Sequence, residues 1–310
     1  MNDNYYLLLA GGVGAAKFIE GIAQIVDQEA LKIIVNTGDD IELFGLQICP
    51  DLDIITYTLA GLVDKDKGWG YQHDTFNCLS VLKKYFNTGW FNAGDKDLAT
   101  HIYRTDLFNK GLNKAQITTK ICQNLGIKAE ILPMCNEPVG TYIETPKGWI
   151  HFEEYFIKHL CQPEVLDIEF RGINEANALK KIFEHIERAE KIILCPSNPI
   201  VSIGTILGVK GIRRALSETK DKVYGISPII QGLTVKGPAD KLMRFLGLEV
   251  SCVGVAQFYQ DLLGHFIIDN KDHTLKPKIE ELGIKCYCYD TLMVNLKKKV
   301  ELAQYIMNLH

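Results

Sequence analysis

The stretch LLLAGGVGAAKFIEG, residues 7–21, decides the fold class of this 310-residue chain. It passes from an apolar run typical of a buried strand into a glycine-rich turn and then into a helical pattern. Such a turn offers unpaired backbone N–H groups and the positive end of a helix dipole to an anion. The stretch therefore predicts the first strand and helix of an α/β fold, with a phosphate-binding loop that contains Gly11, Gly12, Gly14 and Lys17.

Two motifs that the sequence lacks limit the kinds of ligand that this loop is expected to bind. A nicotinamide-dinucleotide site has an acidic residue at the end of the second strand, but here the strand KIIVN ends in Asn36. The chain also contains no Gly-Lys-Ser/Thr sequence, so the loop is not of the Walker type. We therefore expect a nucleotide or phosphate ligand, in a protein that is neither a standard dehydrogenase nor a standard NTPase.

Charge and composition exclude several functional classes. The formal charge of −4 lacks the positive excess of a protein that grips nucleic acid. No apolar run is long enough to cross a bilayer, and the first residues lack the features of a signal peptide. The nine cysteines are an odd number and mostly lie in apolar runs, which indicates reduced, buried thiols. We expect a cytoplasmic protein that binds neither nucleic acid nor membranes.

Short apolar runs alternate with amphipathic helical stretches along most of the chain, which predicts an α/β fold with a mostly parallel sheet between two layers of helices. We expect one domain over residues 1–310. Its core is residues 1–63 and 172–310, and residues 64–171 form an inserted, largely helical lobe with a short hairpin at 141–152. The predicted strands are Tyr6–Ala10, Lys32–Asn36, Lys191–Cys195, Val223–Ile226, Glu249–Val253, His265–Ile268 and Ile284–Tyr287, and the predicted helices include Ala16–Asp27, Ala176–Glu187, Gly211–Thr219, Ala239–Leu246 and Lys297–Asn308.

Acidic residues gather near the end of the second predicted strand. NTGDD ends in Asp40 at the carboxyl edge of the sheet, and CPDLDII brings Asp51 and Asp53 to the start of a helix. Either aspartate of the second motif is suited to a plain helix N-cap. The functional alternative is a ligand for a hard cation such as Mg²⁺, or a carboxylate beside a reacting hydroxyl.

Two motifs of the lobe mix polar and aromatic residues. GWGYQHDTF contains His73, Asp74 and Thr75, which fit either the start and cap of a helix or a binding site. GDKDLATH contains Lys96 and His101. As a solvated turn this second motif is ordinary, whereas in a site Lys96 would neutralise a transferring phosphate.

Two later strands end in loops rich in serine and proline. CPSNPIVSIGTI contains Ser197 and Asn198, and SPIIQG begins with Ser227. In open α/β sheets, ligands bind outside the carboxyl ends of the strands. We therefore expect these loops, the first glycine loop and the early acidic residues to meet in one crevice.

Taken together, these stretches resemble the 2-phospho-L-lactate transferases, enzymes in the biosynthesis of the deazaflavin coenzyme F-420. The resemblance runs from about Leu7 to Met293. It implies a Rossmann-like three-layer sandwich with an added helical region, assembly as a homodimer, and Mg²⁺ as the metal. The motifs that carry it are AGGVGAAKFIEG, NTGDD, CPDLD, GWGYQHDTF, GDKDLATH, ILPMCNEPV, HFEEYF, CPSNPIVSIG, SPIIQG and GVAQFYQD.

The resemblance also implies a reaction. A guanosine diphospho-substrate that carries lactate or enolpyruvate donates its phospho-acyl unit to the terminal ribityl hydroxyl of 7,8-didemethyl-8-hydroxy-5-deazariboflavin, and GMP leaves. Asp53 and Lys96 match positions that contact the deazaflavin, and they are the expected catalytic residues. The acceptor site would also include His73, Asp74 and Thr75. Asp53→Asn is expected to abolish transfer while leaving folding intact.

The same resemblance assigns the remaining site residues. Asp53 and Asp40 are the expected metal ligands, although Asp53 is alternatively the carboxylate that orients the ribityl hydroxyl. Some relatives have Arg where this chain has Lys96, which changes the geometry of the phosphate contact but not its charge. The expected nucleotide-binding residues are Gly11, Gly12, Gly14, Lys17, Asn36, Ser197, Asn198 and Ser227.

Three other functions compete with this one. A sugar-nucleotide-binding regulatory protein of the same superfamily would keep the glycine loop but would not need CPDLD, HDTF and GDKDLATH together. A nicotinamide-dependent oxidoreductase is suggested only by the first strand–helix–strand unit and is disfavoured by Asn36. A structural protein without a ligand leaves the polar strand-end loops unexplained. Which three-carbon acid the donor carries stays open, as does the general base.

Overall fold

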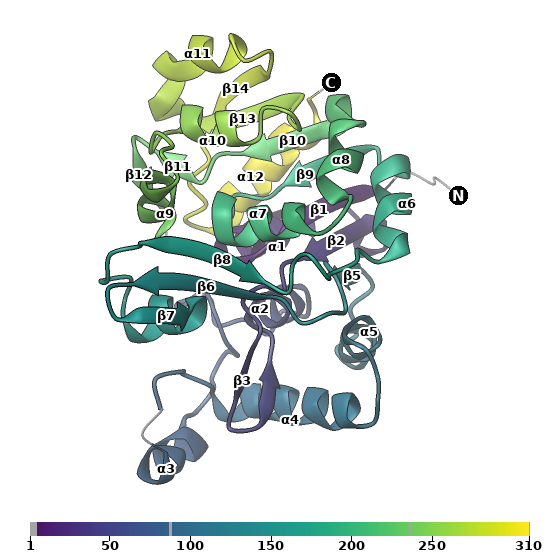
Figure 1. The fold of residues 1–310 in the computed structure, drawn as a ribbon. Helices are drawn as coiled ribbons and strands as arrows, with labels where there is room; N and C mark the ends of the chain where they lie inside the picture. The colour runs from purple at the N-terminus through teal and green to yellow at the C-terminus, as the bar shows by residue number, and fades with distance from the viewer. Residues whose placement is uncertain (1–4, 87–88, 236, 310) are drawn as a thin grey trace.

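The computed structural model describes residues 5–86, 89–235 and 237–309, and its centre is a sheet of seven parallel strands (Figure 1). The strand order is β14-β13-β10-β9-β1-β2-β5. At the middle of the sheet, Leu8 of β1 lies beside Ile33 of β2 and Ile193 of β9. The strands are β1 (Tyr6–Ala10), β2 (Leu31–Val35), β5 (Glu130–Pro133), β9 (Lys191–Leu194), β10 (Val223–Ile226), β13 (His265–Asp269) and β14 (Lys285–Tyr289).

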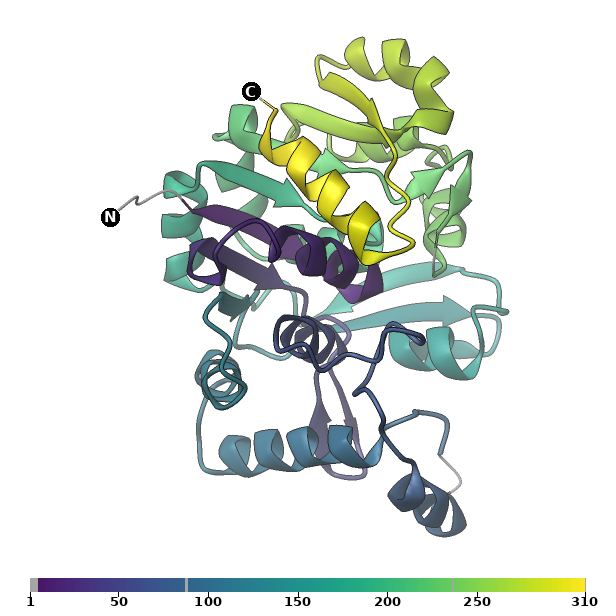
Figure 2. The same ribbon diagram turned by 180° about the vertical axis from the view of Figure 1, so that it is seen from behind.

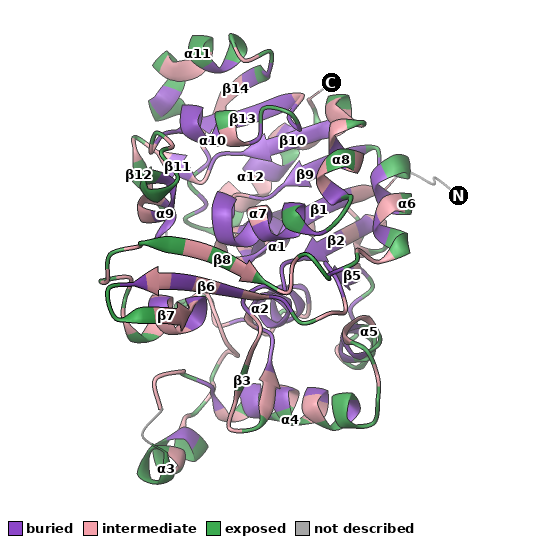
Figure 3. Ribbon diagram, viewed as in Figure 1, coloured by how far each residue is buried: buried purple, intermediate pink, exposed green. Residues whose placement is uncertain are grey.

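Each face of the sheet is covered by helices, because both faces of its strands are apolar. Leu7 and Leu9 of β1 belong to one hydrophobic core, and Leu8 and Ala10 belong to the other. Figure 2 shows α1 and α12 side by side on the second face, where α2 also packs, and Figure 3 shows the central strands as buried. The helices of that face are α1 (Gly12–Ile22), α2 (Pro50–Leu59) and α12 (Leu296–Met307); those of the other are α6 (Lys180–Arg188), α7 (Gly204–Gly208), α8 (Ile212–Ser217), α9 (Ala239–Phe245), α10 (Cys252–Phe258) and α11 (Lys276–Glu280).

The predicted fold class is therefore confirmed: the chain is an α/β, Rossmann-like three-layer sandwich. Successive strands are added on one side of β1 up to β5, and the chain then crosses to β9 on the other side and continues outward to β14. The order of the strands thus reverses between β1 and β9. A reversal of this kind opens a crevice at the carboxyl ends of the two strands, where ligands bind in such sheets.

Segment 64–171 contributes to both the lobe and the sheet. Its helices are α3 (Asn77–Tyr85), α4 (Asp95–Asn109) and α5 (Lys114–Asn124), whereas its strand β5 pairs with β2 at the edge of the main sheet. The predicted hairpin is present as β6 (Gly140–Thr145) and β7 (Gly148–His151), and β8 (Asp167–Arg171) adds a third antiparallel strand. A second hairpin, β3 (Ile41–Leu43) with β4 (Leu46–Ile48), packs on α4, while α3 is mostly exposed (Figure 3).

The predicted strand Glu249–Val253 is wrong. Ser251 is the N-cap of α10, and its side chain accepts a hydrogen bond from the N–H of Gly254. A Cβ on that glycine would lie 1.9 Å from the carbonyl oxygen of Glu249, so the chain turns tightly there. The apolar run VSCVGVA therefore begins a buried helix, and apolar runs of this length do not distinguish a strand from a helix. The nearby β11 (Ile229–Ile230) and β12 (Leu233–Thr234) form a small hairpin of their own.

Among the described residues, the helices are too short or too polar for any of them to cross a membrane.

Gly14 fixes the approach of α1 to the loop after β9. A Cβ at Gly14 would lie 2.0 Å from the carbonyl oxygen of Pro196, a backbone atom that cannot turn away. The glycine is therefore required for packing, whatever ligand the loop binds.

We predict that Gly14→Ala lowers the free energy of unfolding by at least about 2 kcal/mol, because the added methyl group forces the backbone of the two loops apart. Gly283→Ala is the control: that glycine has a φ of +80° but open space around it, so only the left-handed backbone conformation is penalised, by about 1 kcal/mol. Urea denaturation measures both. Equal losses in the two variants would contradict the packing role of Gly14.

Candidate active site

The carboxyl ends of β1 and β9 meet around Asp51, in the first turn of α2. Its Oδ1 accepts a hydrogen bond of 2.7 Å from the N–H of Gly12, and its Oδ2 accepts one of 2.9 Å from the amide nitrogen of Asn36. The N–H of Gly11 donates to Oγ of Ser197 at 3.4 Å. The glycine loop, the end of β2, the start of α2 and the loop after β9 therefore meet at one place, whereas Asp53, which the sequence also led us to expect there, is paired with Arg104 of α4.

Further buried carboxyl groups surround Asp51. Asp39 also accepts from Asn36, at 3.0 Å, and its Oδ1 has no hydrogen-bond partner within the described residues. Burial raises the pKa of Asp51 to about 6. Burial, followed by the charges of Asp51 and Asp40, raises the pKa of Glu153 to about 8. The centre of the crevice thus holds more carboxyl groups than it can keep ionised without a positively charged partner.

Asp40 lies beside this group but has a partner of its own. Its Oδ2 accepts a hydrogen bond of 2.5 Å from the ammonium group of Lys114 on α5, while its Oδ1 is buried without a partner in the described part of the chain. Among residues 5–86, 89–235 and 237–309, no three or more His, Cys, Asp or Glu side chains are arranged to hold a metal ion by themselves.

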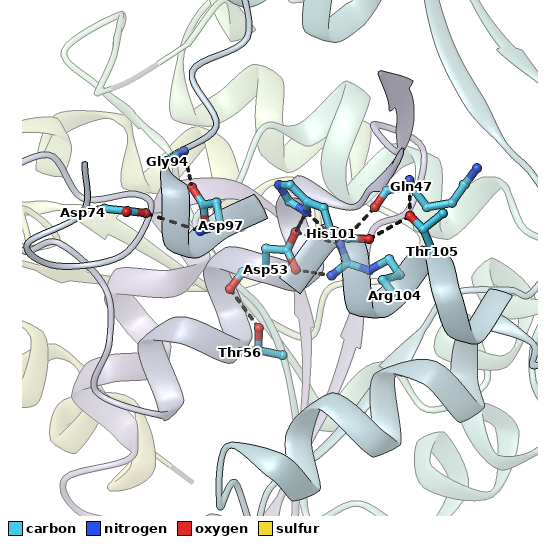
Figure 4. A network of polar contacts seen from close by, with 9 residues as sticks. All are labelled: Gln47, Asp53, Thr56, Asp74, Gly94, Asp97, His101, Arg104 and Thr105. Carbon is cyan, nitrogen blue, oxygen red and sulfur yellow. Dashed lines mark hydrogen bonds and ion pairs between the residues drawn. The ribbon is translucent and has the colours of Figure 1, made fainter. Parts of the chain in front are cut away.

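Asp53 points from α2 toward α4 and is paired with a buried arginine (Figure 4). Nη2 of Arg104 bonds to Oδ1 of Asp53, and Nη1 lies 3.1 Å from Oδ2. Nη1 also lies 3.2 Å from Nδ1 of His101. Burial lowers the pKa of His101 to about 4, so the imidazole is neutral at pH 7. Burial and the charge of Asp53 raise the pKa of the neighbouring Asp97 to about 7.

The lobe residues predicted from GWGYQHDTF and GDKDLATH lie together at the start of α4. Asp74 accepts hydrogen bonds from the backbone N–H groups of Lys96, at 2.9 Å, and of Asp97, at 3.3 Å, so it caps α4 and not the helix that follows it in sequence. Thr75 donates to Asp95 at 2.5 Å, and His73 has a φ of 53°. The predicted alternative of a structural cap is therefore the observed role of Asp74, although it acts on α4.

Lys96 is exposed beside a hollow in the lobe. Its ammonium group donates to the carbonyl oxygen of Gln72 at 2.9 Å. The hollow has a volume of about 320 Å³, and its walls include the aromatic rings of Tyr71 and Tyr103. Tyr71 in turn packs on Tyr57 of α2, with 4.2 Å between the ring centroids. Tyr71 therefore both lines the hollow and contacts α2, the helix that carries Asp53.

Two of the predicted nucleotide-binding side chains, those of Asn198 and Ser227, are engaged in turns of the backbone, and a third, Lys17, lies beside another lysine. Asn198 caps the turn after β9, where its Oδ1 accepts from the N–H groups of Ile200 and Val201. Ser227 closes the turn after β10 through bonds with the backbone of Ile229. Lys17 lies near Lys299 of α12, and burial followed by that charge lowers the pKa of Lys17. A role for these residues in nucleotide binding stays a prediction.

Sequence reasoning missed Arg104, Lys114, Asp97 and Glu153 as members of this site. A signal was present for α4, because Asp97, His101 and Arg104 are spaced four and three residues apart and so share one helix face. Glu153 was visible only as part of HFEEYF. Lys114 had no signal of its own, since its partner is 74 residues away.

We predict that Asp53→Asn lowers the free energy of unfolding by about 3 kcal/mol, because it leaves the buried charge of Arg104 unpaired. The expectation that this variant leaves folding intact is therefore revised. The double variant Asp53→Asn/Arg104→Met should recover much of the loss, as urea denaturation would show. Asp261→Asn, which breaks the exposed pair with Arg213, should cost less than about 1 kcal/mol. Additive losses at Asp53 and Arg104 would contradict their coupling.

We predict that stability decreases as the pH rises from 5 to 8. The ordinary pKa of Glu153 is 4.5 and its pKa in the folded protein is about 8, so between these values the folded state holds a proton that the unfolded state has lost. One such proton contributes a slope of about 1.4 kcal/mol per pH unit. Glu153→Gln should make the decrease of the melting temperature with pH shallower by one proton's contribution, because Asp51 and Asp97 have raised pKa values of their own, whereas exposed Glu187→Gln should leave it unchanged. A wild-type profile that is flat or rises would contradict this.

The chain is similar in sequence to known transferases. The sequence model of the family described as 2-phospho-L-lactate transferase CofD matches residues 7–303. The 2-phospho-L-lactate transferase of Methanosarcina acetivorans is 39% identical over 303 residues, covering 98% of each chain. The phosphoenolpyruvate transferase of Streptomyces griseus is 37% identical over 309 residues, covering 98% of this chain and 97% of the relative.

The fold also has a solved counterpart. The crystal structure of a member of the UPF0052 family from Bacillus halodurans matches 99% of this chain and 100% of its own, with a TM-score of 0.68 and 14% identity, which shows the fold alone. The family match and the identities with the curated relatives go further. The chain belongs to the 2-phospho-L-lactate transferase (CofD) family and is a transferase.

Proposed function

We propose that this transferase moves a phospho-lactyl or phosphoenolpyruvyl group from a guanosine diphospho-donor to the terminal ribityl hydroxyl of 7,8-didemethyl-8-hydroxy-5-deazariboflavin, in the biosynthesis of coenzyme F-420. The observation that carries the proposal is the cluster around Asp51 at the carboxyl ends of β1, β2 and β9, where the glycine loop, Asn36 and the serine loop after β9 meet. The names of the relatives supply the three-carbon acid as lactate or enolpyruvate.

The bonds of the reaction define what the protein has to do. The oxygen of the acceptor hydroxyl attacks the phosphorus that bears the three-carbon acid, the bond from that phosphorus to the bridging oxygen breaks, and GMP leaves. The hydroxyl proton passes to a base or to solvent. Such a transfer depends mainly on positioning and on neutralising charge, with little covalent chemistry from the protein. The two substrates must therefore be held with their reacting oxygen and phosphorus in line.

The donor is placed by this proposal at the glycine loop and the loop after β9. The N–H groups of Gly11 and Gly12 donate to Oγ of Ser197 and Oδ1 of Asp51. A phosphate that approaches them also approaches the carboxylate of Asp51, which repels it. A cation between the carboxylates and the phosphates would turn this repulsion into attraction.

The residues fit a Mg²⁺ ion of the kind that is held by one or two carboxylates and by substrate phosphates. Oδ1 of Asp39 and Oδ1 of Asp40 are buried carboxylate oxygens without a partner among the described residues. Asp53, the other expected ligand, would have to share its oxygens with Arg104. When bound, the ion would neutralise charge on the transferring phosphates, and Asp51 and Asn36 would hold the surrounding carboxylates in place.

The acceptor is placed beside α4. The hollow next to Lys96 has Tyr71 and Tyr103 in its walls, and aromatic side chains stack well on a planar ring system. His73, Asp74 and Thr75 lie at the same end of α4 and complete the proposed acceptor site. Lys96 would supply positive charge there. Assembly as a homodimer and a cytoplasmic location stay predictions from the resemblance.

The proposal predicts that the protein, mixed with the deazaflavin, Mg²⁺ and either the lactyl or the enolpyruvyl guanosine diphospho-donor, forms the phosphodiester product and GMP. Mass spectrometry of the two parallel reactions identifies the acid that is transferred. Omitting Mg²⁺ with EDTA present, or Asp39→Asn, which removes a proposed ligand of the ion, should reduce product by about 100-fold or more, because charge neutralisation at the phosphates is lost. Formation of neither product by a folded protein would contradict the proposed function.

A further inference from the structure

Arg104 is 5% exposed, and its guanidinium contacts three groups (Figure 4). Both oxygens of Asp53 are held by its two terminal nitrogens, which is the bidentate arrangement of an arginine and a carboxylate. Nη1 also lies 3.3 Å from the carbonyl oxygen of Gln47 and 3.2 Å from Nδ1 of His101. The side chain thus connects α4 with α2 and with the hairpin strand β4.

These contacts determine the protonation of His101. A guanidinium has only donors, so Nδ1 of His101 accepts the hydrogen bond from Arg104. Oδ2 of Asp53 lies 3.6 Å from the same nitrogen, which is too far for a hydrogen bond. A ring nitrogen that accepts a hydrogen bond carries no proton, so the proton of His101 lies on Nε2. The contacts of Arg104 therefore select the Nε2–H tautomer.

The Nε2–H group of His101 donates no hydrogen bond within the described part of the protein. Nε2 of His101 is buried and has no hydrogen-bond partner among the described residues, and the same holds for the hydroxyl of Tyr57 on α2. Buried polar groups in native proteins are nearly always paired, so an unpaired one calls for a bound group. Two polar groups near Asp53, the Nε2–H of His101 and the hydroxyl of Tyr57, therefore lack hydrogen-bond partners. Oxygen atoms of a bound polyol or phosphate would supply such partners.

We propose that Arg104 is the positioning residue of this site: it orients the carboxylate of Asp53 and fixes His101 as a neutral Nε2–H donor to an oxygen of a bound substrate. The inference deepens the proposed function and rests on it for the identity of that substrate. A lysine at this position would keep the charge but lacks the planar fork, so it cannot hold both oxygens of Asp53 and Nδ1 of His101 together.

The tautomer is tested on the wild-type protein without any assay of transfer. Long-range ¹H–¹⁵N NMR of protein labelled with ¹⁵N-histidine distinguishes the two tautomers and the imidazolium, and the signals missing from His101→Asn assign the residue. We expect the Nε2–H tautomer at pH 7 and a mixture in Arg104→Lys. A wild-type His101 that is protonated on Nδ1 overturns the inference.

Substrate contact is tested by titrating the same labelled protein with GMP and Mg²⁺ and, separately, with the deazaflavin. The Nε2 signal of His101 should shift with one of these probes, because the unpaired N–H acquires a partner. No shift of that signal with either probe, under conditions where other signals show that the probe binds, overturns the donor role.

Kinetics test the positioning role. Arg104→Lys should lower kcat by about 100-fold with less than threefold change in either KM, because the displaced groups act on the aligned reactants and not on binding. Arg213→Lys alters an exposed bidentate pair with Asp261, away from the site, and should leave kcat unchanged. A folded Arg104→Lys with wild-type kcat overturns the proposal. If the wild-type protein transfers neither acid, the proposed function fails, while NMR still decides the role of Arg104.

Discussion

The carboxylate of Asp51 accepts a hydrogen bond at each oxygen, from the N–H of Gly12 and from the amide of Asn36, and through them α2 is attached to the ends of β1 and β2. A negative side chain therefore lies at the N-terminus of α1, where the helix dipole favours it. Residues two apart on a helix point to nearly opposite sides, so Asp53 faces away from the sheet and toward α4. The spacing of two aspartates in CPDLD thus allows one helix to link the core and the lobe.

The link on the lobe side is a buried ion pair. Replacing such a pair by apolar residues is often neutral or stabilising, so Asp53 and Arg104 add little to stability as a pair, while each depends strongly on the other. What the pair provides is geometry. The N–H of Gln47 donates to Oγ1 of Thr105 at 2.9 Å, and the carbonyl oxygen of Gln47 accepts from Arg104, so both backbone polar groups of one residue of β4 hold α4. The position of α4 relative to α2 follows from these short contacts.

The sequence predicted the sheet and the meeting of its loops well, because parallel strands place their carboxyl ends at one edge whatever their distance in the chain. Tyr6–Ala10 and Val223–Ile226 match the observed strands residue for residue. The sequence analysis did not predict strand β5, through which part of ILPMC joins the main sheet. It also did not predict the partner of Asp53, Arg104, which is 51 residues away. Contacts between side chains on separate elements depend on how those elements pack, and no local pattern specifies this.

The distribution of charge separates the acidic residues into two groups that the sequence could not distinguish. Asp53 and Asp40 have buried cationic partners, Arg104 and Lys114. Asp51 and Asp39 accept hydrogen bonds from the amide of Asn36, Glu153 lies near the charges of Asp51 and Asp40, and burial raises the pKa of all three. Protons and a metal ion compete for the same ionised carboxylates. A bound cation would therefore favour ionisation of the second group, and the proposed Mg²⁺ ion would draw on both groups, through Oδ1 of Asp39 and Oδ1 of Asp40.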